Sequence, residues 1–307
     1  MKHFSLAILF SLTYLFSHAQ GWMPCNLAVN SNATWGTAVC VHNNKIFACN
    51  NHHGLQVSTD NGQTWNVVND TLGTTGIFLY STGNRLYAIE TNSGCSLIRY
   101  SINDGVSFEQ DTIALPTCYP NTPLRPSTAG YGATVAWNNH LMMSLAGPDW
   151  EFSRNTNDSA WVDVAYFDAN DCSEFYVNKD TCWAATNGAT SHGVAWSTDG
   201  INWTSPVSTG IPTYYVPTQI AWNQDRLFMM GGDVAAANAG VDTILKYSDD
   251  HGLTFQDKNI KQYLLTPNQS TRDIFSAYNN LYFTLANNIN GSCPDLLLST
   301  DNGQTFT

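Results

Sequence analysis

The residues of this 307-residue chain that could do chemistry are few, and most of them fall between apolar segments. Asp149-Trp150-Glu151 places two carboxylates beside an indole, which could stack on a sugar ring while the acids hydrogen-bond its hydroxyls. Tyr214 and Tyr215 form a second aromatic pair between two prolines, and Arg125 and Arg272 could clamp a carboxylate. The candidate ligand-binding residues are Arg125, Tyr131, Asp149, Trp150, Glu151, Tyr214, Tyr215, Asp233 and Arg272. Each also has an ordinary alternative as a turn residue, a packed ring or a surface ion-pair partner.

No established catalytic or metal-binding pattern accompanies these residues in the sequence. There is no Ser-His-Asp order, no glycine-rich phosphate loop and no HExxH run. His52 and His53 are adjacent, so their rings point apart, and the eight cysteines contain no CxxC pair. We therefore expect no metal and no cofactor, and we assign no catalytic residue. The net charge is -12 with only 12 Lys and Arg, which excludes a nucleic-acid partner.

The N-terminus predicts export. Residues 1–3 are basic, residues 6–16 are apolar and residues 17–19 resemble a signal-peptidase site. We therefore expect a secretory signal peptide over residues 1–19 and one domain over residues 20–307; an uncleaved anchor is the alternative. No later apolar run is long enough to span a membrane, and eight cysteines suit an oxidising, extracellular compartment.

The elements that must position the candidate residues form an internal repeat. Five segments follow the pattern Ser-x-Asp-x-Gly-x-Thr-Trp or a close variant, at residues 58–65, 101–108, 197–203, 248–255 and 299–306. Each follows an apolar run. The Asx side chain can bond backbone N–H groups of a turn, and the glycine accepts a positive φ, so each segment predicts a hairpin turn.

A second repeated element lies upstream of these turns. An Asn- or Asp-led strand recurs at residues 44–48, 84–88, 139–143, 225–229 and 280–284, with a weaker copy at 178–183. A further strand is expected before each, at residues 37–41, 76–80, 133–137, 162–167, 218–222 and 273–277. No segment shows a helical period. The sequence therefore predicts an all-β protein of six four-stranded units.

The repeated turns resemble Asp boxes, also called bacterial neuraminidase repeats, and the chain resembles the Asp-box β-propeller family with its sialidase-like fold. The resemblance implies a six-bladed β-propeller of four-stranded antiparallel blades. Because the sequence stops one residue after the last box aromatic, we expect residues 22–29 to supply the outer strand of the last blade. A chain that is a fragment of a longer array, incomplete at its C-terminus, is the alternative.

In such a blade the box turns and the Asn-led turns share one face, and the candidate ligand-binding residues fall in loops on the other. Sialidases clamp their substrate with three arginines, the first in an Arg-Ile-Pro motif, but here the first arginine after residue 19 is Arg85 and no Arg-Ile-Pro occurs. We therefore expect a secreted, non-catalytic glycan-binding or scaffold module whose partner is an extracellular glycan or a cell-surface protein. A divergent glycoside hydrolase using loop-face carboxylates and a protein–protein interaction module are the alternatives.

Repeat registration also predicts the disulfides. Cys95 and Cys293 occupy the same position before their boxes, six residues upstream of the box serine. Cys118 lies in the connection that leaves the second blade, and Cys25 holds the matching place if the N-terminus completes the ring. The predicted pairs are Cys95–Cys118, Cys25–Cys293, Cys40–Cys49 and Cys172–Cys182, the last two as cross-strand pairs.

Overall fold

The computed structural model describes residues 38–50, 54–72, 77–91, 96–111, 134–144, 151–155, 161–164, 172–187, 192–212, 215–233, 245–263, 269–287 and 295–307. Several predictions lie outside these residues. They are the signal peptide at 1–19, the strand at 22–29, the ligand candidates Arg125, Tyr131, Asp149, Trp150 and Tyr214, and the cysteines Cys25, Cys95, Cys118 and Cys293.

The described residues form six antiparallel sheets, each built from consecutive strands. Sheet 1 holds β1 (Val39–His42), β2 (Lys45–Asn50), β3 (Gly54–Ser58) and β4 (Asn66–Asn69). Sheet 2 holds β5 (Ile77–Thr82), β6 (Arg85–Thr91), β7 (Ser96–Ser101) and β8 (Glu109–Gln110). Sheet 3 holds β9 (Thr134–Trp137), β10 (His140–Ser144), β11 (Glu151–Asn155) and β12 (Val162–Asp163).

Sheet 4 holds β13 (Cys172–Asn178), β14 (Thr181–Asn187) and β15 (His192–Ser197). Sheet 5 holds β16 (Tyr215–Asn223), β17 (Arg226–Asp233), β18 (Leu245–Ser248) and β19 (Gln256–Lys258), followed by a 3-10 turn at Lys261–Tyr263. Sheet 6 holds β20 (Gln269–Ala277), β21 (Asn280–Asn287) and β22 (Asp295–Ser299).

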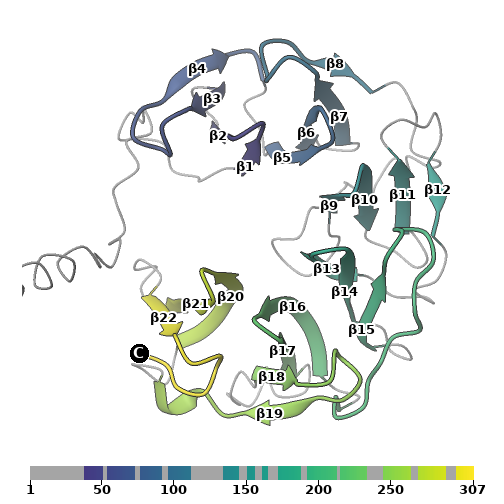
Figure 1. Ribbon diagram of the computed structural model, residues 1–307, viewed down its shortest axis with the longest axis vertical. Coiled ribbons are helices and arrows are strands. Elements are labelled where there is room, and N and C mark those ends of the chain that lie inside the picture. The colour runs from purple at the N-terminus through teal and green to yellow at the C-terminus, as the bar shows by residue number, and fades with distance from the viewer. Residues whose placement is uncertain are drawn as a thin grey trace, which may run out of the picture.

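The sheets radiate from a common centre, with the first strand of each innermost and the last at the rim (Figure 1). Neighbouring sheets pack through five hydrophobic clusters, one between each consecutive pair along the chain. The cluster between sheets 5 and 6, for example, interleaves Phe228 and Leu245 with Ile274 and Phe283. The predicted all-β, β-propeller fold is confirmed, and sheets 4 and 6 hold three strands where four were expected.

The predicted hairpin turns are confirmed at atomic detail. In the first box the Ser58 hydroxyl accepts the Gly62 N–H at 2.8 Å. The Asp60 carboxylate accepts the Thr64 N–H at 2.8 Å and the Thr64 hydroxyl at 2.6 Å. Gly62 has φ of 87°, a conformation that a residue with a Cβ rarely adopts. The box is therefore a closed hydrogen-bonded turn.

One predicted strand was wrong. Residues 162–167 were expected to be the inner strand of the unit that contains Asn178, but β12 (Val162–Asp163) is instead the rim strand of sheet 3. The inner strand of sheet 4 is β13. A short apolar run has the same composition in either position, so pattern alone could not separate the two.

Two of the predicted disulfides are also wrong. Cys40 and Cys182 are free thiols. Cys40 pairs with Phe47 across β1 and β2, so Cys49 is its diagonal neighbour, roughly 7–8 Å away in such a ladder and beyond disulfide reach. Cys182 pairs with Val177, far along the ladder from the Cys172 position. No helix among the described residues is long and apolar enough to cross a membrane.

Candidate functional site

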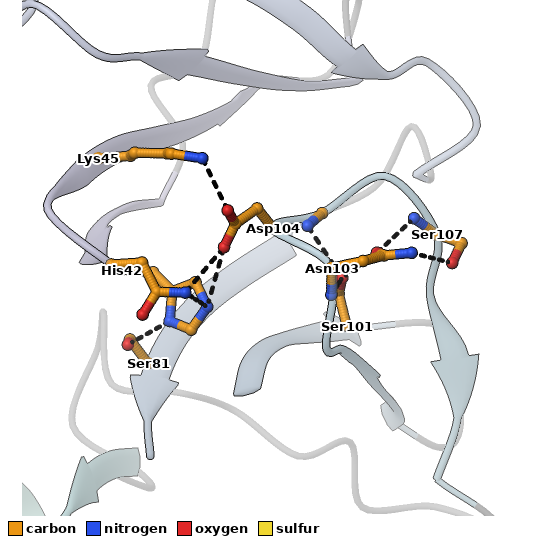
Figure 2. Close-up of polar contacts among 9 residues, drawn as sticks. His42, Lys45, Ser81, Ser101, Asn103, Asp104 and Ser107 are labelled. Atoms are coloured by element: carbon orange, nitrogen blue, oxygen red, sulfur yellow. Dashed lines mark hydrogen bonds and ion pairs between the residues drawn. The ribbon is translucent and has the colours of Figure 1, made fainter. Parts of the chain in front are cut away.

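The Asn-led turns and the Asp boxes gather on one side of the sheets, which we call the turn face. Figure 2 shows a group of polar contacts on this face that joins sheets 1 and 2. Nδ1 of the buried His42 ring lies 2.8 Å from the Ser81 hydroxyl, and its Nε2 lies 3.5 Å from Asp104. Lys45 and Asn43 reach the same carboxylate at 2.7 Å and 2.9 Å. We call this contact the His42 joint.

A serine, a histidine and an aspartate in contact could suggest a nucleophile and its base, but the same joint recurs with other chemistry between sheets 5 and 6. There Asn223 stands at the position of His42 and bonds Ser276 at 3.0 Å and Asn302 at 3.1 Å. Arg226, at the position of Lys45, donates to the Asn302 carbonyl at 2.9 Å. The joint is therefore a structural tie between sheets, and burial of His42 lowers its pKa, opposed by the Asp104 charge.

A second polar group lies on the inner strands of sheets 4, 5 and 6. β13, β16 and β20 each contain a β-bulge, next to Glu174, Gln219 and Asp273 respectively. Each of these three residues stands four positions before the end of its strand, so the bulges are equivalent in the three repeats. Bulges re-aim side chains and are frequent beside functional sites. We call Glu174, Gln219 and Asp273 the inner row.

The inner row is linked across the three sheets. The Glu174 carboxyl accepts the backbone N–H of Ile220, in the next sheet, at 2.6 Å. The Gln219 side chain in turn donates to the carboxyl of Asp273. The Oε1 atom of Gln219 is buried and has no hydrogen-bond partner. The bulge residue Ser173 donates to the Pro217 carbonyl at 2.7 Å, which holds the bulges of β13 and β16 together.

Electrostatics set the inner row apart from the boxes. Burial raises the pKa of Glu174 to about 8, the Ile220 N–H opposes this, and the charge of Asp273 adds to it. Burial also raises the pKa of Asp273, although its side chain is solvent-exposed in part. In the boxes the opposite holds: hydrogen bonds from Thr64 lower the pKa of Asp60 to about 2. Glu174 therefore keeps its proton near neutral pH and can donate a hydrogen bond.

Four of the predicted ligand candidates lie in described strands. Glu151 begins β11 and pairs with Ser144, and Asp233 ends β17 and pairs with Tyr215. Arg272 is the bulge residue of β20, directly before Asp273. Asp233, Tyr215 and Arg272 thus lie at the end of sheets 5 and 6 that also carries the inner row.

Tyr215, a candidate ligand-binding residue from the sequence, is instead a packed ring of the core. Its side chain is 3% exposed, its hydroxyl donates to the Met229 carbonyl at 3.3 Å, and the Lys246 ammonium lies 5.1 Å from its ring centre. The strand was expected to begin at residue 218, but β16 begins at Tyr215 and takes this ring into the core between sheets 4 and 5.

Sequence reasoning missed the inner row as a site. Aligning the repeats on their Asn-led turns would have shown polar residues at one position in three successive units, where sheets 1 and 2 carry Ala38 and Phe78. Among the described residues, no group of three or more His, Cys, Asp or Glu side chains could hold a metal ion.

Comparison with known proteins supports the fold and the repeat. The family model for the BNR/Asp-box repeat matches residues 56–67. No curated protein is similar enough in sequence to count as a relative. Among solved structures, the GH74 xyloglucanase from Xanthomonas campestris has a TM-score of 0.62 at 15% identity over 89% of this chain. The chain spans 45% of that enzyme.

Two further solved structures are similar over most of their own length. YCF48 bound to D1 peptide has a TM-score of 0.61 at 16% identity, covering 91% of this chain and 82% of that one. A polysaccharide lyase of family PL25, an ulvan lyase bound to a sulfated disaccharide unit, has a TM-score of 0.55 at 11% identity, covering 89% and 83%. At these identities the likeness shows the fold alone: the chain carries an Asp-box repeat on a β-propeller.

Proposed function

We propose that this Asp-box β-propeller is a secreted, non-catalytic module that binds an extracellular glycan at the end of the inner strands that carries the inner row. The single observation that carries the proposal is the inner row, because it offers a proton donor, a carboxylate acceptor and a buried amide oxygen that lacks a partner. Two of the structural neighbours act on polysaccharides, which supports the ligand class. Export through residues 1–19 remains part of the proposal.

The chemistry of the inner row suits hydroxyl groups. A sugar hydroxyl donates one hydrogen bond and accepts others, so it can donate to Gln219 Oε1 or Asp273 while accepting from the protonated Glu174. An unpaired buried acceptor costs free energy that a bound donor restores. Arg272 directly precedes Asp273, and an arginine there suits an acidic sugar. Trp150 and Tyr214 remain predicted to cover the apolar face of a sugar ring.

The test is a glycan array followed by titration calorimetry on the best hit, with xyloglucan and ulvan oligosaccharides included. Gln219→Ala and Asp273→Asn should weaken binding about tenfold each, the loss of roughly one hydrogen bond to a ligand. Asp180→Asn, an exposed carboxylate at the far end of sheet 4, is the matched control and should bind as wild type. Equal affinities for all variants would contradict the inner-row site. Binding only to a protein or peptide would favour a protein-interaction module.

A divergent glycoside hydrolase is the second candidate, favoured by the raised pKa of Glu174, to which the charge of Asp273 contributes. One protonated and one ionised carboxyl group are what such hydrolysis requires. Release of reducing ends from the bound oligosaccharide, abolished by Glu174→Gln while binding persists, would replace the binding-module proposal. Absence of reducing ends over a long incubation, with binding retained, would support it.

A further inference from the structure

The inner row presents oxygen atoms from three consecutive repeats. Its strands β13, β16 and β20 pack in that order around the centre of the sheets (Figure 1). Each strand has its bulge at the equivalent place, so Glu174, Gln219 and Asp273 occupy equivalent positions in three neighbouring strands. The chemistry of these side chains restricts the kind of ligand group that they can bind.

Hydrogen bonds within the row use its amide donor and leave acceptors. The Glu174 carboxyl accepts the Ile220 N–H at 2.6 Å through one of its oxygens. The Gln219 amide nitrogen donates to the Asp273 carboxyl, so its Oε1 atom remains, buried and without a partner among the described residues. Amide oxygens and ionised carboxyl groups only accept hydrogen bonds. Apart from the proton on Glu174, the row therefore offers acceptors to a ligand.

The two carboxyl groups of the row lack a positive partner among the described side chains. Burial raises the pKa of Glu174, the charge of Asp273 adds to the rise, and a hydrogen bond opposes it. Burial also raises the pKa of Asp273, and again only hydrogen bonds oppose it. Asp104 on the turn face differs, because a hydrogen bond from Lys45 and the charge of Lys45 both lower its pKa. A cation is thus missing from the inner row and present at the turn face.

The strands that pack against β13 supply no compensating charge. Strands β9, β14 and β16 lie against it, and their sequences contain no Asp, Glu, Lys or Arg. Within the described side chains, the ionisable groups that interact with Glu174 are therefore Asp273 and Tyr176. Burial raises the pKa of Tyr176, and the charge of Glu174 raises it further, so this tyrosine stays neutral.

A primary ammonium group matches what the row lacks. It donates three hydrogen bonds, accepts none and carries a positive charge. An opposite charge favours the ionised form of a carboxyl group, so a bound ammonium group lowers the pKa of Glu174 and releases its proton. A neutral hydroxyl group can donate to Gln219 Oε1, but it leaves the carboxyl groups of Glu174 and Asp273 without a counter-charge.

The charge of the whole chain acts in the same direction. The net charge is -12, with 24 acidic and 12 basic residues, so the field of the protein attracts cationic ligands and repels polyanions. Arg272, the residue before Asp273, suits an acidic sugar, but such a ligand approaches against this field and meets two carboxyl groups. The balance of charge favours a cationic glycan.

Resting on the glycan-binding function proposed above, we propose that the inner row preferentially binds a glycan that carries free primary amino groups. The ammonium group of one amino sugar donates to Gln219 Oε1, to Asp273 and to Glu174, which releases its proton to solvent. Acetylation of the amino group removes the charge and two of the three N–H donors. An N-acetylated glycan with the same backbone is therefore a weaker ligand.

The test compares two ligands with one sugar backbone, the glucosamine hexamer and the N-acetylglucosamine hexamer. Titration calorimetry at pH 6, where most of the amino groups are protonated, should show at least about tenfold tighter binding of the glucosamine hexamer. Asp273→Asn and Gln219→Ala should remove most of this preference. Asp180→Asn, which removes an exposed carboxylate at the turn end of sheet 4, is the matched control and should keep it. Residual binding of the N-acetylglucosamine hexamer shows that a variant is folded.

Proton release is a second readout of the same titration. The binding enthalpy of the glucosamine hexamer should vary with the ionisation enthalpy of the buffer, because the buffer takes up the proton of Glu174. Glu174→Gln has no such proton and should release less, by up to about one proton per ligand. The partial protonation of the ligand is the same in both titrations, so the difference belongs to Glu174. Asp180→Asn should match wild type.

The outcomes separate this inference from the proposed function. Equal affinities for the two hexamers, both weakened by Asp273→Asn, overturn the amino-group preference and leave glycan binding at the inner row intact. Failure of both hexamers and of every glycan on the array overturns both. Tighter binding of ulvan oligosaccharides assigns the row to an acidic sugar, and equally tight binding of a lysine hexapeptide assigns it to a protein partner. Loss of the preference in Asp180→Asn as well as in Asp273→Asn shows attraction by overall charge, which also overturns the inference.

Discussion

The turn face and the inner row are both polar, but they differ in how far their hydrogen bonds are satisfied. In every described box the hydroxyl of the first serine accepts the N–H of the box glycine, and the His42 joint recurs with Asn223 in place of the histidine. The inner row has an unpaired acceptor at Gln219 and carboxyl groups whose pKa values are raised. A polar arrangement that recurs between repeats indicates a structural role, whereas raised carboxyl pKa values beside a buried unpaired acceptor indicate a site for a ligand.

The largest effect should come from breaking the backbone of a box. Gly303 has φ of 80°, and a Cβ there would lie 2.5 Å from the Phe228 ring. Gly303→Ala should therefore lower the free energy of unfolding by about 2–5 kcal/mol, combining a left-handed alanine with overpacking. Gln304→Ala, an exposed neighbour in the same turn, should change it by less than about 0.5 kcal/mol. Denaturant unfolding measures both, and equal values would show that the boxes are dispensable.

The next effect concerns the pH dependence of stability and belongs to the inner row. The pKa of Glu174 is about 8 when folded, above its ordinary value of 4.5, so the folded protein binds more protons between those values. Its contribution is therefore present at pH 4–5 and is lost as pH rises towards 8. We expect the free energy of unfolding to fall by about 2 kcal/mol over this pH range. A fully buried carboxyl group with the same pKa would give a larger fall, because solvent screens a partly exposed one.

Glu174→Gln keeps the acceptor for the Ile220 N–H and removes the titration. Unfolding measured at pH 5 and pH 8 should give nearly equal free energies for this variant, with Asp180→Asn as the control that retains the wild-type slope. If the free energy of unfolding of Glu174→Gln fell between pH 5 and pH 8 as much as that of wild type, the titrating group would be another residue. The box carboxylates do not interfere, because Asp60, Asp199, Asp250 and Asp301 have pKa values of about 2 and lose their contribution only in stronger acid.

A smaller effect on stability is expected when the histidine of the His42 joint is replaced by asparagine, the residue at the equivalent contact between sheets 5 and 6. His42→Asn installs the residue that stands at the equivalent position in sheet 5, where it bonds Ser276 and Asn302. At pH 7.5 we expect a change in the free energy of unfolding below about 1 kcal/mol, whereas His42→Ala should cost about 1–3 kcal/mol by leaving buried partners unpaired.

The histidine also has a pH signature. Its pKa is lowered by burial, so it is neutral when folded, and its contribution is lost as pH falls below the ordinary value of 6.5. His42→Asn should remove that acid-side loss. If His42→Asn were instead as damaging as His42→Ala, the two joints would not be equivalent, and the His42 joint would have to be reconsidered as a site.

The features that could be predicted from the sequence depend on contacts between residues close together in the chain, and those that could not depend on contacts between distant residues. The boxes were predictable because Ser58, Asp60 and Thr64 bond one another within one turn. The cysteine pairs Cys40–Cys49 and Cys172–Cys182 failed because strand register separates them: Cys40 pairs with Phe47, two residues from Cys49, and Cys172 pairs with Thr186, four residues from Cys182. The inner row was missed because its contacts join residues far apart in sequence, such as Glu174 and Ile220. Bulges, which position these side chains, leave no clear mark in the sequence pattern.

The smallest effect tests whether the box carboxylates serve structure alone. The second box has Asn103 where the first has Asp60, and its Oδ1 accepts the Ser107 N–H at 3.0 Å while its Nδ2 donates to the Ser107 hydroxyl at 2.9 Å. An amide thus supports the same turn as a carboxylate. Asp60→Asn should therefore change the free energy of unfolding by less than about 0.5 kcal/mol and leave glycan affinity unchanged. Denaturant unfolding measures the free energy, and titration calorimetry with the glycan found on the array measures the affinity. A loss of binding comparable to that of Asp273→Asn would mean that the turn face contacts the ligand, because the two positions lie at opposite ends of the sheets and share no hydrogen-bond partner.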